Sequence, residues 1–354
     1  MVLGPTAGLI IAIFLQLISA SVNFIGMTIQ KKAATKIPKI SKETGFLKSI
    51  KNMLFNKAWI FGLVLNSSST LFAAGAFALA SISIIQPLYG FGLIVLVIFI
   101  HFYLKERITR LDILGVIFGA AGIVVIGLAA TPTEALDYTV MRNMFISINS
   151  MIFFGIISAI ALIAYIVSEK TKKTTSLIFL VISSAIWTST QNIFNKAVAT
   201  SVGDLGLKGA LFGDAALYSW VFILMFLFVS IIGIIMLNIA YQNGHGVIIL
   251  PIWTAIQVII PVLSGIIIFD EWNPSNGLTE TDIIVTIVGI VIMLASIIIL
   301  SISNGRKESF SKLISATSDN GDSNNEILVL KQKEDSTVEG KEELESNQNN
   351  LKEN

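Results

Sequence analysis

Apolar runs recur along the chain from residue 7 to residue 302, and short polar segments separate them. Each run holds about 20 residues, which is enough for an α-helix to cross the roughly 30 Å hydrocarbon core of a bilayer. The backbone finds no hydrogen-bond partner in lipid, and these runs lack the alternation of barrel strands, so the pattern predicts helices. The nine predicted spans are residues 7–30, 57–79, 81–104, 110–130, 146–168, 174–199, 216–241, 246–269 and 281–302.

Basic residues are confined to alternate loops. Residues 31–57 hold eight Lys and one Glu, and the turns at 105–110 and 169–173 each hold three Lys or Arg. The loops poor in Lys and Arg are residues 131–145, 200–215 and 270–280. Because Lys and Arg are enriched in cytoplasmic loops, nine spans put every basic loop on the cytoplasmic side. We therefore predict a multi-pass protein of the cell membrane or an organelle membrane, with the N-terminus outside and the C-terminus in the cytoplasm.

The overall composition agrees with a membrane protein and excludes several functions. The chain is 54% hydrophobic and only 13% charged, whereas soluble domains carry about 25% charged residues. It has no Cys, which excludes disulfides and Cys-ligated metals, and its two His residues (His101 and His245) lie in different segments, which argues against a His metal site. We expect membrane lipid as a partner, and no cofactor, no nucleic-acid partner and no enzymatic activity.

The last 52 residues differ in composition from the rest. Residues 303–354 carry eleven acidic and seven basic residues together with Ser, Asn, Gln and Gly. Such a segment cannot bury enough apolar surface to fold alone. We therefore predict a polytopic membrane domain over residues 1–302 and a disordered polar cytoplasmic tail over residues 303–354.

The membrane domain contains an internal repeat. Placing Pro87 on Pro251 also brings together, with small insertions, Glu106 and Glu271, Asp112 and Asp282, and Gly119 and Gly289. Spans 1–4 (residues 7–130) therefore resemble spans 6–9 (residues 174–302), and a fifth helix (146–168) links them. Because this single linking helix crosses the membrane once, the second copy has the opposite orientation in the membrane. Inverted repeats of this kind place a substrate site near the bilayer midplane, where the two copies meet.

Polar side chains inside the spans are the candidates for such a site, because each needs a partner away from water. The candidate substrate-pathway residues are Asn23, Asn66, Gln86, Tyr89, Gln191, Asn192, Asn238, Gln242, Trp253 and Gln257. Three prolines (Pro87, Pro251 and Pro261) are expected to kink their helices and free backbone carbonyls. Interhelical hydrogen bonding for the amides and simple packing kinks for the prolines are the alternative interpretations.

Charged residues lie only near the ends of the predicted spans, as Lys196 does in the span 174–199. Glu106, Asp270 and Glu271 lie at helix ends and are either an acidic gate or solvated charges. The G-xxx-G pair Gly115 and Gly119 predicts close helix packing, either inside the bundle or across a homodimer face.

Several short stretches carry a family resemblance. "FAAGAFALASISIIQPLYGFGLIVLVIFIHFYLKERITRLDILGVIFGAAGIVVIG" and "LNIAYQNGHGVIILPIWTAIQVIIPVLSGIIIFDEW" resemble the paired repeats of the drug/metabolite transporter superfamily. "IGMTIQKK", "LNIA" and "FDEW" resemble its NIPA-like magnesium transporter branch in particular. The resemblance covers residues 7–302.

The resemblance implies an alternating-access carrier of Mg²⁺ or another divalent cation. Mg²⁺ usually binds one or two carboxylates and keeps several waters, whereas the predicted midplane offers amides, hydroxyls and freed carbonyls. The metal ligands therefore stay unknown at this point. An EamA-like carrier of a small neutral or zwitterionic metabolite is the alternative transporter. A non-transporting receptor or scaffold that binds partners through the tail is the alternative of another class.

Overall fold

The computed structural model describes residues 5–34, 36, 51–104, 109–130, 136–171, 173–243, 246–273 and 279–319. The chain divides into two compact units, Met1–Asn304 and Gly305–Asn354, and the first unit holds the predicted membrane domain. The last helix of the chain continues to Asp319, so it enters the segment predicted as a disordered tail. Residues 320–354 of that predicted tail lie outside the described residues.

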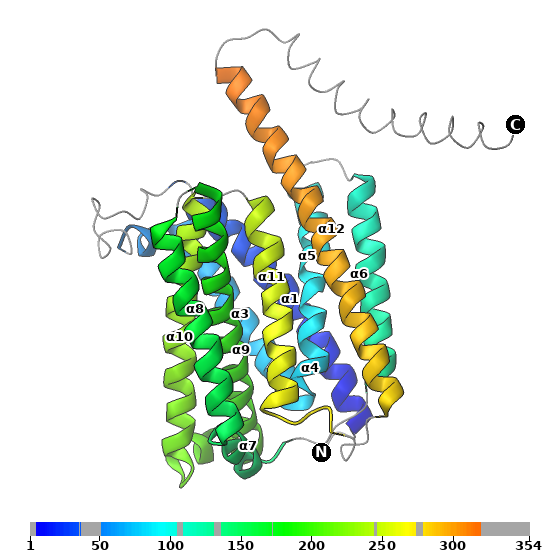
Figure 1. Cartoon of the computed structure of the whole chain (residues 1–354), viewed down its shortest axis with the longest axis vertical. Coiled ribbons are helices and arrows are strands. Elements are labelled where there is room, and N and C mark those ends of the chain that lie inside the picture. The colour runs from blue at the N-terminus through cyan, green and yellow to red at the C-terminus, as the bar shows by residue number, and fades with distance from the viewer. Residues whose placement is uncertain are drawn as a thin grey trace, which may run out of the picture. The chain divides into compact units, whose positions relative to one another are not determined.

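The described part of the chain is built from helices, without a strand (Figure 1). Their order is α1 (Pro5–Ala34), α3 (Lys57–Leu79), α4 (Ile82–Ile85), the 3₁₀ helix η1 (Gln86–Gly90), α5 (Phe91–Leu104), α6 (Arg110–Ala129), α7 (Tyr138–Phe145), α8 (Ile148–Lys170), α9 (Lys173–Phe212), α10 (Ala216–Asn243), α11 (Gly246–Ile267) and α12 (Glu280–Asp319). Among the described residues, eight helical segments are long and apolar enough to cross a membrane, and Ile252–Ile267 of α11 is a shorter apolar helix. The prediction of an all-α integral membrane protein is confirmed.

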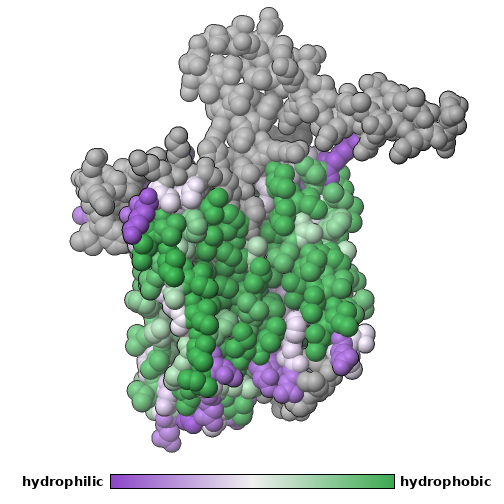
Figure 2. Space-filling model, viewed as in Figure 1, coloured by the Kyte–Doolittle hydropathy of each residue, from purple (hydrophilic) through white to green (hydrophobic). Residues whose placement is uncertain are grey.

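The outer surface of the first unit is apolar along most of the helix length. Figure 2 shows a broad hydrophobic belt with hydrophilic residues toward the ends of the helices. Large side chains such as Phe14, Leu128 and Leu217 are each more than 60% exposed. An apolar surface of this extent is unusual for a soluble monomer but suits contact with lipid.

Two segments form the inside of the bundle. In the segment Ile82–Phe99, 78% of the residues are buried, and in the apolar stretch of α9 the share is 67%. In the six other candidate spans it lies between 28% and 39%. α9 contacts α3, α8, α10 and α11, and η1 contacts α1 and α11. Polar residues on α9 and η1 are therefore held away from lipid.

The structure differs from the predicted spans in several places. α9 continues to Phe212, through most of the predicted loop at 200–215, and two further differences concern residues 81–104 and 131–145. The span predicted at 81–104 is a short helix, a 3₁₀ turn and a longer helix (α4, η1 and α5). Pro87 lies in the 3₁₀ turn, where its missing N–H and rigid ring prevent a regular α-helical ladder. The predicted loop at 131–145 contains α7, which begins after Asp137, whose side chain accepts hydrogen bonds from the N–H groups of Thr139 and Val140.

Helices α6 and α12 pack closely through the Gly face of α6. A Cβ atom at Gly115 would lie 2.5 Å from Leu300 Cδ2, and one at Gly119 would lie 2.8 Å from Ser296 Oγ. Ser296 Oγ donates a hydrogen bond to the Gly115 carbonyl at 2.7 Å. The G-xxx-G face therefore packs inside the chain, as the first of the two interpretations predicted.

α6 and α12 run in opposite directions and begin in the same way. Thr109, before α6, lies 2.8 Å from Ser303 in α12, whereas a Cβ at Gly122 would meet Met293 and Gly289, about three to four turns earlier in α12. The N–H of Thr109 donates to Asp112 Oδ2 at 2.7 Å, and the N–H of Thr279 donates to Asp282 Oδ2 at 2.9 Å. These caps lie at positions that the repeat alignment equates. The inverted repeat stays a prediction, and both observations agree with it.

Candidate functional site

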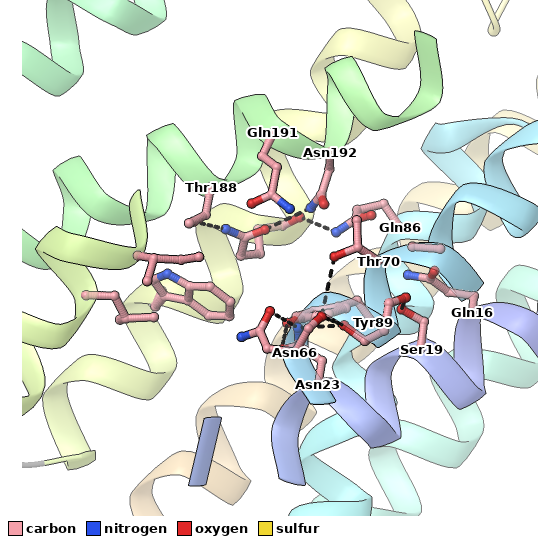
Figure 3. A pocket seen from close by; sticks show the side chains of 16 residues that line it. Gln16, Ser19, Asn23, Asn66, Thr70, Gln86, Tyr89, Thr188, Gln191 and Asn192 are labelled. Carbon is pink, nitrogen blue, oxygen red and sulfur yellow. Dashed lines mark hydrogen bonds between the residues drawn. The ribbon is translucent and has the colours of Figure 1, made fainter. Parts of the chain in front are cut away.

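A polar cavity lies within the bundle, where α1, α3, η1, α9, α10 and α11 meet (Figure 3). The space open to the centres of water molecules is about 50 Å³, which is room for several waters. The lining residues are Gln16, Ser19, Asn23, Asn66, Ser69, Thr70, Ala73, Gln86, Tyr89, Thr188, Gln191, Asn192, Ile234, Leu237, Trp253 and Gln257. Among the described residues, this lining consists of amides, hydroxyls, two aromatic side chains and three apolar side chains, and none of them is charged.

The structure brings most of the predicted pathway residues together. Eight of the ten line this cavity: Asn23, Asn66, Gln86, Tyr89, Gln191, Asn192, Trp253 and Gln257. The other two do not line it. Asn238 accepts a hydrogen bond from Trp59 Nε1 at 3.0 Å, and Gln242 Nε2 donates one to the Ala34 carbonyl at 3.3 Å. These two amides therefore join α10 to α3 and to α1, as the alternative of interhelical hydrogen bonding stated.

On the α1 and α3 side of the cavity, Asn23 organises its neighbours. Its Oδ1 accepts a hydrogen bond from Tyr89 OH at 2.5 Å. Its Nδ2 donates to Ser69 Oγ at 3.0 Å and to Asn66 Oδ1 at 3.2 Å. One amide thus fixes side chains from α3 and η1, and both of its polar atoms are used within the wall.

On the α9 and α11 side, Gln257 has the same role. Its Nε2 donates to the Ala185 carbonyl at 3.2 Å and also to Thr188 Oγ1. Its Oε1 accepts a hydrogen bond from Asn192 Nδ2 at 2.9 Å. The backbone carbonyl of Gln257 accepts from Gln86 Nε2 at 2.9 Å, which fixes the orientation of the Gln86 amide. The amide nitrogens of Asn192, Gln257 and Gln86 therefore bond to the wall.

Three buried polar atoms of the lining have no hydrogen-bond partner within the described residues: Gln16 Oε1, Gln86 Oε1 and Trp253 Nε1. Gln16 and Gln86 are each 1% exposed. Because buried polar groups are nearly always hydrogen-bonded, such atoms indicate a water, ion or ligand site. The cavity thus offers two acceptor oxygens and one donor that no described residue satisfies.

Gln16 was absent from the sequence prediction, although the sequence holds a signal for it. Gln16, Ser19 and Asn23 are spaced by three and four residues, which is one face of a helix. All three are buried in the structure. Counting polar residues at helical spacing along α1 would have found Gln16.

Two aromatic rings meet across the cavity. The ring centroids of Tyr89 and Trp253 are 6.2 Å apart, with an interplanar angle of 53°. Each ring lies two residues after a proline that the repeat alignment pairs, Pro87 or Pro251. The side chain of Pro251 lies outside the described residues. Pro261 has no N–H to donate to the carbonyl of Gln257, four residues before it, and this carbonyl instead accepts the hydrogen bond from Gln86 Nε2 in the cavity wall.

The three candidate gate acids have different surroundings. Glu106 lies outside the described residues, and Asp270 is exposed and accepts a hydrogen bond from Asn273 Nδ2 at 2.7 Å. Glu271 is 7% exposed, and its Oε1 lies 2.6 Å from Lys196 Nζ. For Glu271, the interpretation as a solvated charge is therefore wrong.

The environment of Glu271 favours the charged carboxylate. Burial by itself raises the pKa of Glu271, but the Lys196 ammonium and hydrogen bonds from Ser83 outweigh it and hold the pKa below its ordinary value of 4.5. The described residues contain no group of three or more His, Asp or Glu side chains placed to hold a metal ion. A cation in the cavity would therefore meet neutral oxygen atoms.

Comparisons with known proteins agree with this architecture. Residues 6–306 match the family described as magnesium transporter NIPA. Three relatives come from Arabidopsis thaliana. The chain is 30% identical to "Probable magnesium transporter NIPA9" over 42% of each chain. It is 22% identical to "Probable magnesium transporter NIPA2" over 64% of this chain and 67% of the relative, and 24% identical to "Probable magnesium transporter NIPA4" over 70% and 71%.

The alignment with the first of these relatives spans less than half of its length. No solved structure matches the chain. The family match covers most of the chain, and the described helices have the length and apolar composition of membrane spans. The chain is a multi-pass membrane protein that belongs to the magnesium transporter NIPA family.

Proposed function

We propose that the chain is an alternating-access transporter that moves Mg²⁺ or another divalent cation through the cavity. The observation that carries this proposal is the pair of buried amide oxygens, Gln16 Oε1 and Gln86 Oε1, that line the cavity and accept no hydrogen bond from a described residue. Oxygen atoms are the ligands that Mg²⁺ prefers. The relatives are named as probable magnesium transporters, which supports the same cargo.

The lining favours an ion that keeps most of its water. Mg²⁺ gives up water reluctantly and is usually bound through one or two carboxylates, and the described residues of the lining include none. Six water oxygens at about 2.1 Å from the ion enclose a sphere of about 39 Å³. The cavity offers about 50 Å³ to water centres. The hydrated ion is therefore comparable in volume to the cavity, and its waters would donate to the amide oxygens.

Alternating access follows from the two repeats. Antiparallel packing of α6 on α12, and equal caps at their starts, support an inverted arrangement. The cavity is lined by helices from both repeats, with α1, α3 and η1 from the first and α9, α10 and α11 from the second. Rocking of one repeat against the other would expose such a site to each side in turn.

The test is transport by the full chain in proteoliposomes that contain a Mg²⁺-sensitive dye. We expect uptake that depends on the protein and is blocked by cobalt(III) hexaammine, an inert complex close in size to hydrated Mg²⁺. Gln86→Leu should lower uptake at least fivefold, because it removes one acceptor oxygen. Gln242→Leu, a matched change outside the cavity, should keep uptake within twofold. A silent dye, or equal rates for both variants, would contradict the proposal.

One observation favours the alternative cargo. Trp253 Nε1 is a buried donor without a partner in the described residues, and a donor suits a ligand with an acceptor group, such as the carboxylate of a zwitterionic metabolite. The same proteoliposomes, supplied with labelled amino acids and nucleosides, test this function. Accumulation of such a solute with no change in the Mg²⁺ dye would establish it instead.

A further inference from the structure

A buried ion pair lies close to the cavity but takes no part in its lining. Lys196 in α9 and Glu271, after the end of α11, approach to 2.6 Å between Nζ and Oε1, and their side chains are only 5% and 8% exposed. Glu271 Oε1 also accepts the backbone N–H of Ile82 at 2.9 Å, and Oε2 accepts that of Ser83 at 2.9 Å. Both oxygens of the carboxylate are therefore occupied.

The pair joins three segments, and two of them lead directly to residues that line the cavity. Lys196 lies one helical turn after Asn192 on α9. Ile82 and Ser83 begin α4, about one turn before Gln86. The carboxylate thus joins the start of the segment that carries Gln86 and Tyr89 to the helix that carries Asn192.

The surroundings of Glu271 are shaped to its carboxylate. A Cβ atom at Gly265, two turns after Gln257 on α11, would lie 2.5 Å from Glu271 Oε2 and 2.8 Å from Ser83 Cβ. Lys196 Nζ lies 4.8 Å from the centroid of the Phe269 ring. Trp272 Nε1 donates to Ser83 Oγ at 3.2 Å, so the residue after Glu271 also contacts the start of α4.

This geometry argues against Glu271 as a station for the cargo. Its charge is balanced by Lys196, and each oxygen already accepts a backbone N–H. Taking two charges out of water costs free energy, and a well-packed apolar pair is often as stable. A buried pair that joins segments of the two predicted repeats is therefore better explained by a role in conformation than by a role in stability alone.

We propose that Lys196 and Glu271 form a latch that closes the cavity at the end of the bundle where α4 begins and positions Gln86 and Tyr89. The latch joins the first repeat, through α4, to the second repeat, through α9 and the segment after α11. Opening the cavity toward this end requires the carboxylate to leave the N–H groups of Ile82 and Ser83. This inference rests on the proposed function only in taking the cavity as the cargo site.

The sequence has no Cys, so a single introduced cysteine reports on the cavity without background. Thr70 lines the cavity from α3, and Thr70→Cys is the reporter. Full-length protein is placed in sealed vesicles of each orientation, and a charged, membrane-impermeant thiol reagent is added outside. The labelling rate from the Glu271 end measures how often that end is open, and it does not depend on the cargo.

The pair is removed by the double change Lys196→Met and Glu271→Gln. We expect labelling from the Glu271 end to be at least tenfold faster than in the reporter alone, and labelling from the other end to be slower. Asp270→Asn is the matched control at the neighbouring carboxylate, which is exposed, and it should leave both rates unchanged. Asn also tolerates the positive φ of 49° at this position.

Glu271→Asp is a second variant that keeps the charge but shortens its reach, and it should give an intermediate rate even if the double variant fails to fold. Unchanged labelling in every folded variant would overturn the latch. Faster labelling in a protein that does not transport Mg²⁺ would keep the latch and reject the proposed cargo. Absence of labelling from both ends in all variants, with Mg²⁺ transport intact, would show that the cavity is not the pathway and would reject the latch.

Discussion

The ion pair allows a prediction with a worked magnitude. Removing one partner of a buried pair leaves an uncompensated charge and costs about 3–5 kcal/mol, and side-chain exposures of 5% and 8% mean that solvent screening does not reduce this cost much. Lys196→Met leaves Glu271 with its two backbone N–H donors. We therefore expect the lower value, about 3 kcal/mol, for this variant.

Glu271→Gln should cost more, about 4–5 kcal/mol. It leaves Lys196 buried, and it also replaces one acceptor oxygen by an NH₂ group. Because Ile82 and Ser83 donate to different oxygens, the NH₂ group must face one of these N–H donors. In the double variant only this mismatch remains, at about 1–3 kcal/mol for one unsatisfied buried donor. The two changes should therefore couple by at least about 4 kcal/mol.

The assay is thermal unfolding of the detergent-solubilised full chain, followed by the recovery of monodisperse protein after heating. At roughly 2–4 °C per kcal/mol, Lys196→Met should lower the midpoint by about 6–12 °C. The double variant should unfold at a higher temperature than Glu271→Gln alone. Single variants that each cost less than about 1 kcal/mol, or a double variant that shows the sum of both losses, would refute the reasoning from burial and hydrogen bonding.

Three further predictions concern other parts of the first unit. Gly119→Ala should destabilise the protein by about 1–3 kcal/mol in the same assay, because its Cβ would lie 2.6 Å from Ile94 Cδ1. Gly127→Ala is the control, because no atom lies within 4 Å of the new Cβ, and it should be neutral or stabilising by up to about 1 kcal/mol. Tyr89→Phe removes the hydrogen bond to Asn23, so it should lower the unfolding free energy by about 1 kcal/mol and also lower Mg²⁺ uptake. Unchanged uptake would exclude Asn23 and Tyr89 from the pathway. The difference in unfolding midpoint between the wild-type chain and Glu271→Gln should stay constant from pH 8 to pH 6. This difference should shrink only below the ordinary carboxyl pKa of 4.5. The pKa of Glu271 is lowered in the folded state, so the stabilisation by its carboxylate is lost as the pH falls through the folded pKa. A difference that shrinks already near neutral pH would contradict a lowered pKa.

The sequence predicted the helices well where lipid alone determines them. The predicted span 57–79 coincides with α3, because a continuous apolar run in lipid has no other way to satisfy its backbone. It predicted less well where neighbouring helices replace lipid. The break between α4, η1 and α5 depends on Pro87 and on the Glu271 carboxylate that receives the first N–H groups of α4. Hydrophobicity along the chain contains no information about such a partner, 189 residues away.

For the candidate site, too, the sequence predicted what depends on single residues and missed what depends on neighbouring helices. Amides inside apolar spans were recognised one by one because each needs a partner away from water, and eight of ten line the cavity. Asn238 and Gln242 have equal amide chemistry, but their partners are Trp59 on α3 and the Ala34 carbonyl on α1. The distinction between a wall amide and a packing amide depends on the rotation of α10 about its axis, which single-residue chemistry does not specify.

The buried ion pair was missed for a physical reason that concerns helix length. The predicted span 174–199 put Lys196 near its end, where a long side chain can reach water. The helix instead continues to Phe212, and its first break in helical backbone geometry is at Gly206, with a φ of 66°. Lys196 therefore lies well inside a helix that is buried over most of its apolar stretch. A Lys in this position must find an anion within the protein, and Glu271 is the carboxylate that meets it. Extending the predicted helix to its first Gly break would have turned an apparently solvated Lys into evidence for a buried acidic partner.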